Sequence, residues 1–185
     1  MRKLLLVLLL AGACAAPVTL DRQSPAMFQN EPGGHEEAEV VRVVDGDTIR
    51  VQISGRTEGP GAGSATVGQE YSVRLLGIDT PETVRPGTPV ECFGREASAA
   101  AKALLEGETV RMVDDVENVD RYDRLLRYVY IGDEMANARL VVNGYASAYT
   151  YPPNVRHADL FVQLEREARD NDRGLWSPTT CSGER

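Results

Sequence analysis

VVRVVDGDTIRVQI, residues 40–53, places two β-branched runs on either side of the polar turn Asp45-Gly46-Asp47. Valine, isoleucine and threonine pack well on a pleated surface, and an Asp-Gly pair between two such runs is a strong hairpin signal. We therefore predict two antiparallel strands, Val40–Val44 and Thr48–Ile53. The two aspartates of the turn would stand where these strands meet.

The rest of the chain alternates short strands with amphipathic helices. Gly55 to Gln69 is rich in glycine and carries no periodicity, which predicts a long loop. One helix falls between the third and fourth strands, and two more close the sequence. This order predicts an α+β, mainly β, fold: the five-stranded Greek-key barrel called the OB-fold. The further predicted strands are Tyr71–Ile78, Thr109–Val113 and Leu125–Ile131, and the predicted helices are Glu96–Leu105, Asp133–Asn143 and Ala158–Arg169.

The composition is that of a soluble globular protein. The chain has 185 residues, 42% of them hydrophobic and 26% charged, which is enough for one domain. Its formal net charge is −8 and its pI is about 4.9. This charge argues against a protein that coats nucleic acid through a general positive field, but not against a local pocket of arginines that grips one phosphate. We expect a monomer.

The first sixteen residues are typical of an export signal. The positive pair Arg2-Lys3 precedes the apolar run Leu4–Leu10 and the small residues Ala11-Gly12-Ala13. The apolar run is too short to span a bilayer. Cys14 follows at once, in a context similar to a bacterial lipoprotein box, so lipidation of Cys14 and ordinary cleavage beside it both stay open. The mature protein is expected to be secreted or anchored at the cell envelope, touching the membrane only through the signal or a lipid.

The mature chain divides into a tether, a domain and a short tail. Residues 17–38 are rich in Pro, Gly, Gln, Asn and Glu and predict a flexible tether. The acidic stretch His35–Glu39 at its end is expected to be solvated. Residues 39–181 form the predicted domain and 182–185 its tail.

Two cysteines, Cys92 and Cys181, remain in the predicted domain. An even pair in an oxidising compartment favours a disulfide, which would tie the segment before the first helix to the C-terminal tail. Two free buried thiols are the alternative. A metal role is disfavoured because no histidine or cysteine cluster accompanies them.

Asp47 and Asp79 are the candidate metal ligands, because both stand at predicted strand ends of one small barrel. A hard cation such as Ca²⁺ takes oxygen ligands, and the Thr80 carbonyl beside Asp79 is a third candidate. Pro81 stiffens the segment that leads to Glu82, whose carboxylate could orient or deprotonate an attacking water. Taken singly, an aspartate beside glycine is more often a turn former, and Glu82 would be a surface glutamate.

Two arginines complete the set. Arg74 lies in the third predicted strand and Arg124 starts the fifth. Guanidinium groups match phosphate oxygens in a bidentate way and hold their protons, so stabilisation of transition-state charge is the expected role. Alone, each would be a surface strand residue, while Asp120 and Asp123 fit turn residues that pair with nearby arginines. Together the carboxylates and arginines indicate hydrolysis of a nucleic-acid backbone.

Three tyrosines are the candidate substrate contacts. Tyr149 and Tyr151 alternate, so they share one side of an extended segment, and Tyr122 lies between the two arginines of the Asp120–Arg124 stretch. They could stack on a base or hydrogen-bond a phosphate. Packing against the barrel is the alternative.

The chain resembles the staphylococcal nuclease, or thermonuclease, family over about residues 39–177. Several separated motifs occur in the expected order, and together they are specific. The matching residues are Val43–Thr48, Arg74–Thr83, Gly94–Ser98, Asp120–Arg124 and Gly174–Trp176.

The resemblance implies a Ca²⁺-dependent phosphodiesterase acting on DNA, RNA or both. It places Ca²⁺ at Asp47, Asp79 and the Thr80 carbonyl, and Glu82 in the general-base position. Arg74 and Arg124 would bind the scissile phosphate. Water attacks phosphorus in this family and the 5′ oxygen leaves, which gives 3′-phosphate ends. The resemblance also implies nucleotide contacts by Tyr122, Tyr149 and Tyr151, and an acidic position near the metal at Asp45.

Three features depart from the family pattern. A glycine is usual where Asp123 stands, and a carboxylate there could pull the Arg124 guanidinium from substrate. The Gly55–Gln69 loop is long, and the net charge is acidic. A non-catalytic nucleic-acid or protein-binding module on the same fold is therefore the competing hypothesis, and a Ca²⁺-binding envelope protein without activity is a weaker third.

Overall fold

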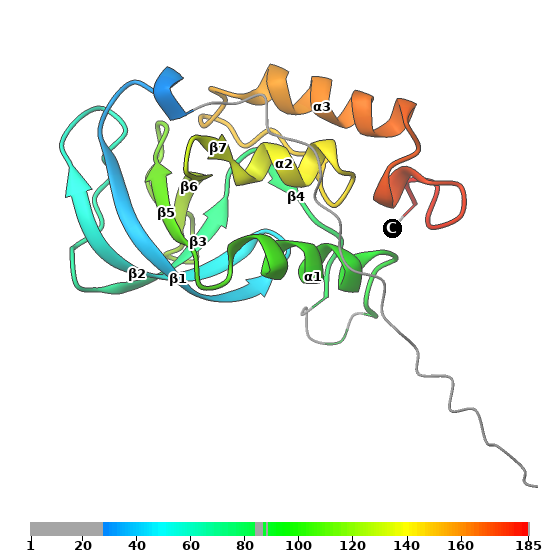
Figure 1. Ribbon diagram of the computed structural model, residues 1–185, viewed down its shortest axis with the longest axis horizontal. Coiled ribbons are helices and arrows are strands. Elements are labelled where there is room, and N and C mark those ends of the chain that lie inside the picture. Colours follow the sequence, from blue (N-terminus) through cyan, green and yellow to red (C-terminus); the bar gives the residue numbers. More distant parts are fainter. Residues whose placement is uncertain (1–27, 84–86, 88, 185) are drawn as a thin grey trace, which may run out of the picture.

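The computed structural model describes residues 28–83, 87 and 89–184, and a closed five-stranded barrel lies at its centre (Figure 1). Antiparallel pairing gives the order β3-β2-β1-β5-β6, and parallel pairing of β3 with β6 closes the barrel. With three helices around it, this barrel confirms the predicted α+β OB-fold. Its strands are β1 (His35–Asp45), β2 (Thr48–Thr57), β3 (Glu70–Leu75), β5 (Thr109–Val113) and β6 (Leu125–Ile131).

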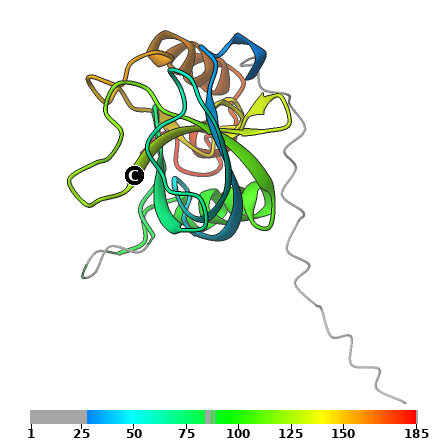
Figure 2. The ribbon, with the colours of Figure 1, turned by 90° about the vertical axis from the view of Figure 1, so that its left-hand side faces the viewer.

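The opening hairpin forms as the β-branched runs predict. Val43 pairs with Ile49 and Asp45 with Thr48, so the turn itself is only two residues long. Register shifts in the β1–β2 pairing bend β1, which lets its first half pair with β5 as well. Figure 2 shows the strands curving around a common interior, with α1 at one end and α3 at the other.

Part of the segment predicted to be a tether forms a helix and the start of a strand. The short helix η1 (Phe28–Asn30) packs on the core, and β1 starts at His35, inside the segment predicted to be a tether. Glu36 is fully buried, not solvated, because Arg127 pairs with it inside the barrel. Predicted solvation of this acidic stretch is therefore wrong at Glu36. Residues 17–27 of the predicted tether and the signal segment with Cys14 lie outside the described residues.

Three helices cover the barrel: α1 (Gly94–Leu105), α2 (Ala136–Val142) and α3 (Ala158–Asp170). The second is shorter than its predicted range because Glu134–Met135 pair with β6 as the short strand β7. The 3₁₀ helix η2 (Gly174–Trp176) follows α3. In residues 28–83, 87 and 89–184, none of the helices has the length and apolarity that crossing a bilayer requires.

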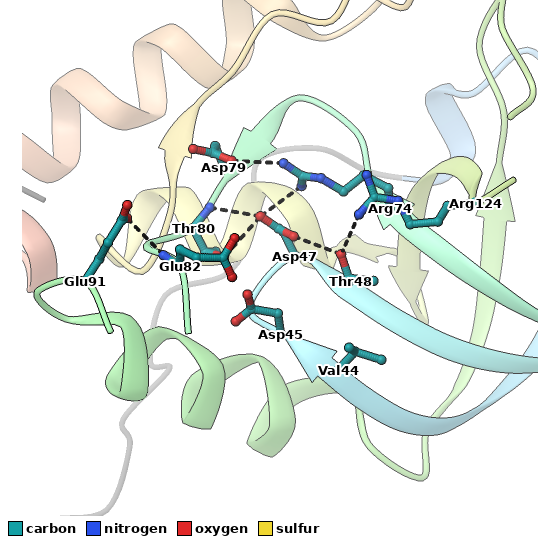
Figure 3. Close-up of a pocket in the computed structure, with 10 residues that line it drawn as sticks. All are labelled: Val44, Asp45, Asp47, Thr48, Arg74, Asp79, Thr80, Glu82, Glu91 and Arg124. Carbon is teal, nitrogen blue, oxygen red and sulfur yellow. Dashed lines mark hydrogen bonds and ion pairs between the residues drawn. The ribbon is translucent and has the colours of Figure 1, made fainter. Parts of the chain in front are cut away.

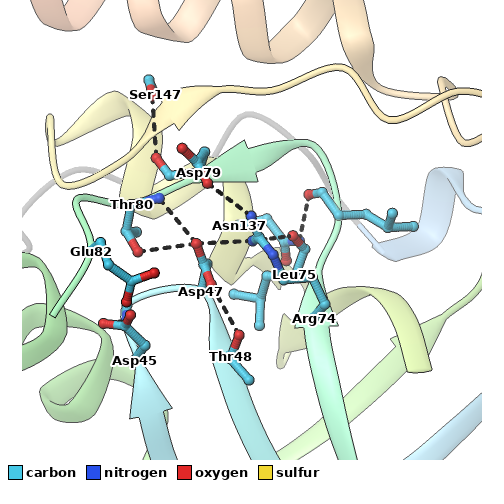
Figure 4. Close-up of polar contacts among 12 residues, drawn as sticks. Asp45, Asp47, Thr48, Arg74, Leu75, Asp79, Thr80, Glu82, Asn137 and Ser147 are labelled. Atoms are coloured by element: carbon cyan, nitrogen blue, oxygen red, sulfur yellow. Dashed lines mark hydrogen bonds and ion pairs between the residues drawn. The ribbon is translucent and has the colours of Figure 1, made fainter. Parts of the chain in front are cut away.

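The third predicted strand breaks at Gly77. Its backbone has φ +78°, and a Cβ there would lie 2.0 Å from the Phe161 ring of α3. Only glycine suits this close approach, so the chain turns and resumes as β4 (Ile78–Asp79), paired with β8 (Ser147–Ala148). The break separates Arg74 on β3 from Asp79 on β4 and aims both at one rim of the barrel (Figure 4).

A continuous apolar core fills the barrel and the layer beneath the helices. Alternate residues of β2 point inward, and α1 and α3 add their buried faces. The buried side chain of Asn137 joins this core to the rim, since it bonds the Leu76 carbonyl and the Val129 N–H. The segments that carry the candidate site are thus fixed from below.

Candidate active site

A cavity of about 320 Å³ opens at the barrel rim, where the β1–β2 turn, the end of β3, β4 and the start of β6 meet (Figure 3). All of its lining residues except Val44 are polar or charged. The structure therefore brings together, in one hollow, the predicted metal ligands, the predicted base and both predicted arginines. The lining residues are Val44, Asp45, Asp47, Thr48, Arg74, Asp79, Thr80, Glu82, Glu91 and Arg124.

Arg74 bridges the two predicted metal ligands. One terminal nitrogen lies 3.0 Å from Asp47 Oδ2 and the other 3.0 Å from Asp79 Oδ1. The arginine side chain is only 15% exposed, so water screens these contacts weakly. One guanidinium thus sets the position of two carboxylates that lie 32 residues apart in the chain.

Asp47 is held from several sides. The Thr48 hydroxyl donates to Oδ1 at 3.0 Å, while the Thr80 N–H and hydroxyl both donate to Oδ2 at 3.1 Å. Gly46 makes this approach possible, since a Cβ there would stand 2.7 Å from the Thr80 hydroxyl oxygen. The Asp-Gly-Asp-Thr turn and the Asp-Thr-Pro segment are therefore one interlocked unit.

Asp45 and Glu82 face each other beside this unit (Figure 4). The Thr83 hydroxyl donates to Asp45 Oδ1 at 2.6 Å, and the Thr83 N–H donates to Glu82 Oε1 at 3.1 Å. Burial raises the pKa of Asp45, with further contributions from the Asp47 charge and from Glu82, against the hydrogen bonds from Thr83 and Gly46. Negative charge is crowded at this wall of the cavity.

Arg124 enters the cavity from the opposite wall. Asp120 Oδ2 lies 2.7 Å from its Nε and 2.7 Å from a terminal nitrogen, and the other terminal nitrogen lies 3.3 Å from the Thr48 hydroxyl. Asp120 also accepts the N–H groups of Tyr122 and Arg124. A buried carboxylate therefore fixes the direction of the arginine.

Asp123 has a backbone role in the turn, and not the interaction with Arg124 that its position in the sequence suggested. Its φ is +59°, the left-handed region that favours glycine and that aspartate tolerates better than most residues. Within the described chain, no hydrogen bond or ion pair joins its carboxylate to Arg124, whose acidic partner is Asp120. In the described structure Asp123 therefore does not pair with Arg124, and its place in the turn explains why glycine suits that position.

The three candidate tyrosines lie around a second cavity of about 500 Å³ that shares Arg74, Asp79 and Arg124 with the first. Tyr122 and Tyr149 are 63% and 50% exposed, so packing against the barrel accounts for only part of each ring. Tyr149 and Tyr151 lie with ring centroids 6.4 Å apart, and the Arg121 guanidinium covers Tyr122 at 4.8 Å. Aromatic faces and cations border the same hollow.

The donor chemistry of the rim fits a hard cation. The cavity is lined by carboxylate, hydroxyl and carbonyl oxygens, and it has no imidazole or sulfur ligand. In the described residues, however, no group of three or more His, Cys, Asp or Glu side chains is close enough to hold a metal by itself. A cation here would need the main-chain oxygen and water beside the two aspartates.

Sequence reasoning missed three supporting side chains: Thr48, Thr83 and Glu91. Each bonds a predicted site residue, and Glu91 accepts the Glu82 N–H at 2.9 Å. Thr48 and Thr83 stand directly beside Asp47 and Glu82, which is a signal that could have found them. No such signal marks Glu91, because its partner Glu82 lies nine positions away in the sequence.

Comparisons with known proteins agree on one family. A family model described as staphylococcal nuclease homologue matches residues 72–178. The chain is 42% identical over 137 residues to a thermonuclease of Staphylococcus intermedius, which covers 74% of each protein. It is 38% identical over 138 residues to a thermonuclease of Staphylococcus hyicus, covering 75% of this chain and 74% of that protein. It is also 34% identical over 138 residues to the endonuclease YncB of Bacillus subtilis, covering 74% and 59%.

Proposed function

Given that the chain belongs to the staphylococcal nuclease family and is a phosphodiester-hydrolysing nuclease, we propose that its rim cavity performs Ca²⁺-dependent endonucleolytic cleavage of DNA, RNA or both. The observation that carries the proposal is the convergence of Asp47, Asp79, Glu82, Arg74 and Arg124 on one cavity. They come from four separate segments of the sequence, which the fold brings to one rim of the barrel.

Asp47, Asp79 and the Thr80 carbonyl would hold the Ca²⁺ ion. When bound, the ion supplies positive charge that polarises the phosphate. Arg74 already forms ion pairs at 3.0 Å with both aspartates. In the proposed site it would hold these metal ligands in place and also bind the phosphate. Loss of this arginine would affect ion binding and phosphate binding alike.

Glu82 takes the proton of the attacking water in this proposal. The new bond joins the water oxygen to phosphorus, and the bond from phosphorus to the 5′ oxygen breaks. That oxygen takes a proton from solvent and leaves as a 5′-hydroxyl, while the other product carries a 3′-phosphate. Arg124 stabilises the charge that develops on the phosphate oxygens, since a guanidinium holds its own protons at neutral pH. The ion pair with Asp120 fixes the orientation of Arg124 before substrate binds.

Tyr122, Tyr149 and Tyr151 would contact the nucleotide next to the scissile bond. Their exposed faces and the neighbouring arginines suit base stacking and phosphate contact. The acidic net charge means that binding rests on these few groups. We therefore expect the logarithm of DNA affinity to fall only shallowly with the logarithm of salt concentration.

We place the enzyme outside the cytoplasm, secreted or anchored at the envelope. The predicted signal segment supports this, and so does the disulfide between Cys92 and Cys181, because disulfides persist in oxidising compartments. The envelope membrane would be touched only through the signal or a lipid on Cys14. The mature enzyme is proposed to act as a monomer.

A Ca²⁺ titration of DNA and RNA digestion tests the proposal. The wild-type protein should cleave both or one of them, and excess chelator should stop the cleavage. Glu82→Gln and Arg74→Ala should each lose most activity, while Glu58→Ala, at an exposed glutamate far from the cavity, should keep it. Cleavage that persists in both site variants would contradict the assignment of catalysis to this cavity. Binding of nucleic acid without cleavage in saturating Ca²⁺ would favour a non-catalytic binding module.

A further inference from the structure

Three consecutive residues, Glu91, Cys92 and Phe93, are each fixed to a different part of the molecule. They lie between the segment that carries Glu82 and the first turn of α1. Glu91 contacts the main chain of Glu82, Cys92 is bonded to the C-terminal tail, and Phe93 stacks on the loop after α2. Three anchors on consecutive residues beside the proposed general base indicate that this segment has a functional role.

Glu91 and Glu82 are joined in both directions. The Glu91 carboxylate accepts the Glu82 N–H at 2.9 Å, and the Glu91 N–H donates to the Glu82 carbonyl at 3.0 Å. Gly94 lies so close behind them that a Cβ would stand 3.1 Å from the Glu82 carbonyl oxygen. The backbone of Glu82 is thus held by residues outside its own segment, and only its side chain extends into the cavity.

Cys92 links this clamp to the C-terminal tail, which is distant in the sequence. Its disulfide partner Cys181 is buried and 89 residues away. The tail that carries Cys181 is fixed in turn, because the Leu175 N–H donates to the Gly144 carbonyl at 2.8 Å and the Gly183 N–H to the Leu175 carbonyl at 2.9 Å. Since neighbouring Cα atoms are about 3.8 Å apart, a fixed Cys92 leaves Glu91 little room to move.

Phe93 adds the third anchor at some cost to its own backbone. It has φ +65°, which is unusual for a bulky residue. Its ring stacks on Tyr145 with centroids 5.7 Å apart and planes 19° from parallel. The surrounding contacts therefore over-determine the path of the chain here, as is common where a segment must present a neighbour accurately.

We propose that Glu91 is a positioning residue for Glu82, and that the Cys92–Cys181 disulfide is the anchor that keeps it in place. The inference rests on the proposed role of Glu82. Glu91 touches no reacting atom: it fixes the Glu82 backbone, so that the carboxylate meets the attacking water at one distance and angle. A displacement of about 1 Å at such a group can cost about 10²-fold in rate.

The decisive experiment is a double-mutant cycle of Glu91→Ala and Glu82→Gln, measured with a defined oligonucleotide in saturating Ca²⁺. Glu91→Ala should lower kcat about 10- to 100-fold with little change in KM, because substrate binding rests on other groups. In the Glu82→Gln background the same change should have almost no further effect on kcat. A purely structural role would reduce kcat by the same factor in both backgrounds.

Two further variants separate the hydrogen bond from the anchor. Glu91→Gln keeps an oxygen that can accept the Glu82 N–H, so most of the lost kcat should return. Replacing both Cys92 and Cys181 by serine should lower kcat less than Glu91→Ala does, since the Glu91 and Phe93 contacts remain, and should also lower Tm. Glu58→Ala is the matched control for loss of a glutamate, and its kcat should not change.

The outcomes are distinguishable. If Glu82→Gln is itself fully active, the proposed function of Glu82 fails. If Glu82→Gln keeps only a small, measurable kcat but Glu91→Ala keeps wild-type kcat, or loses the same factor in both backgrounds, the positioning proposal alone is overturned. Hydrogen exchange of the wild-type protein keeps the test available should Glu91→Ala not fold. The Glu82 amide should be protected, and fast exchange there would contradict the clamp.

Discussion

Arg124 and Arg127 lie three residues apart in the chain, yet one lines the cavity and the other is sealed inside the barrel. All three guanidinium nitrogens of Arg127 are bonded, to the carboxylate of Glu36, to the side chain and carbonyl of Asn118 and to the Leu126 carbonyl. Both partners of the Arg127–Glu36 pair are fully buried. Arg124, in contrast, is 28% exposed and aims at the rim cavity.

The two pairs use the same chemistry for different ends. Glu36 also accepts the Ala65 N–H at 2.7 Å, so the Arg127 pair fastens the long loop after β2 to the barrel. Asp120 instead leaves the far end of Arg124 facing the space that a phosphate would occupy. The Arg127 pair is therefore structural, because protein closes over it. Arg124 keeps an exposed part at the cavity, where we propose that it acts on the substrate.

Arg127→Ala should give the largest effect in this comparison. Removal of one partner from a buried pair leaves an unpaired charge at Glu36, which costs about 3–5 kcal/mol of unfolding free energy. Denaturant unfolding measures this, with Arg50→Ala as control, because that exposed pair should contribute less than about 1 kcal/mol. The folded fraction should retain its kcat. A stable Arg127→Ala protein would break the distinction between the two regions.

Arg124→Ala should act on catalysis instead. Loss of transition-state charge stabilisation should lower kcat about 10²- to 10³-fold. Its unfolding free energy should fall by less than in Arg127→Ala, because Asp120 keeps the N–H groups of Tyr122 and of residue 124 itself. Arg124→Lys should restore only part of kcat, since an ammonium cannot match phosphate with two parallel bonds. Steady-state kinetics on one oligonucleotide tests both variants.

Asp120→Asn sharpens the account of how Arg124 is held. Burial by itself raises the pKa of Asp120, but hydrogen bonds from Arg124 and Tyr122 and the Arg124 charge outweigh it, so the pKa lies below its ordinary value of 3.8. A lowered folded-state pKa stabilises the protein above pH 3.8, and this contribution is lost as pH falls through the lowered pKa. The stability gap between wild type and Asp120→Asn should therefore shrink on acidification.

The same variant should lower kcat by about 10-fold, because Arg124 stays present but is less well directed. Urea unfolding at several pH values, with kcat measured at neutral pH, checks both parts. A gap in stability that is independent of pH would show that Asp120 is not the carboxylate that pairs with Arg124.

Asp123→Gly should have the smallest effect. Glycine suits the φ of +59°, but it also makes the unfolded chain more flexible, so unfolding free energy should change by less than about 1 kcal/mol. The kcat should stay near the wild-type value, since Asp123 does not hold Arg124. A rise in kcat of tenfold or more would instead mean that the Asp123 carboxylate draws Arg124 away from substrate.

The barrel and the main members of the site could be predicted from the sequence because their signals are local. A few consecutive residues are enough to recognise the strand periodicity, the Asp-Gly turn and the Asp79-Thr80-Pro81-Glu82 segment. The family resemblance then supplied the roles. The predicted meeting of Asp47 with Asp79 rested on strand order, and the structure joins them through Arg74.

The remainder depends on contacts that sequence does not display. Glu36 belongs to an acidic stretch for which the sequence predicts solvation. Its partner Arg127 lies 91 residues away, so no local signal indicates the pair. Glu91 reads as a loop residue until its bond to Glu82 is seen. Likewise the partner of Arg124 could not be chosen between Asp120 and Asp123 without the backbone angle that turns Asp123 aside.

We propose that the open cavity, with Arg124 and Glu82 on opposite walls, hydrolyses the bond to the 5′ oxygen in a Ca²⁺-dependent reaction. End-group analysis of oligonucleotide products, made with Ca²⁺ and again with excess chelator, tests it most directly. The products made with Ca²⁺ should carry 3′-phosphate and 5′-hydroxyl ends, and the substrate should stay intact with chelator. Products with 5′-phosphate ends, or unchanged cleavage in chelator, would contradict it.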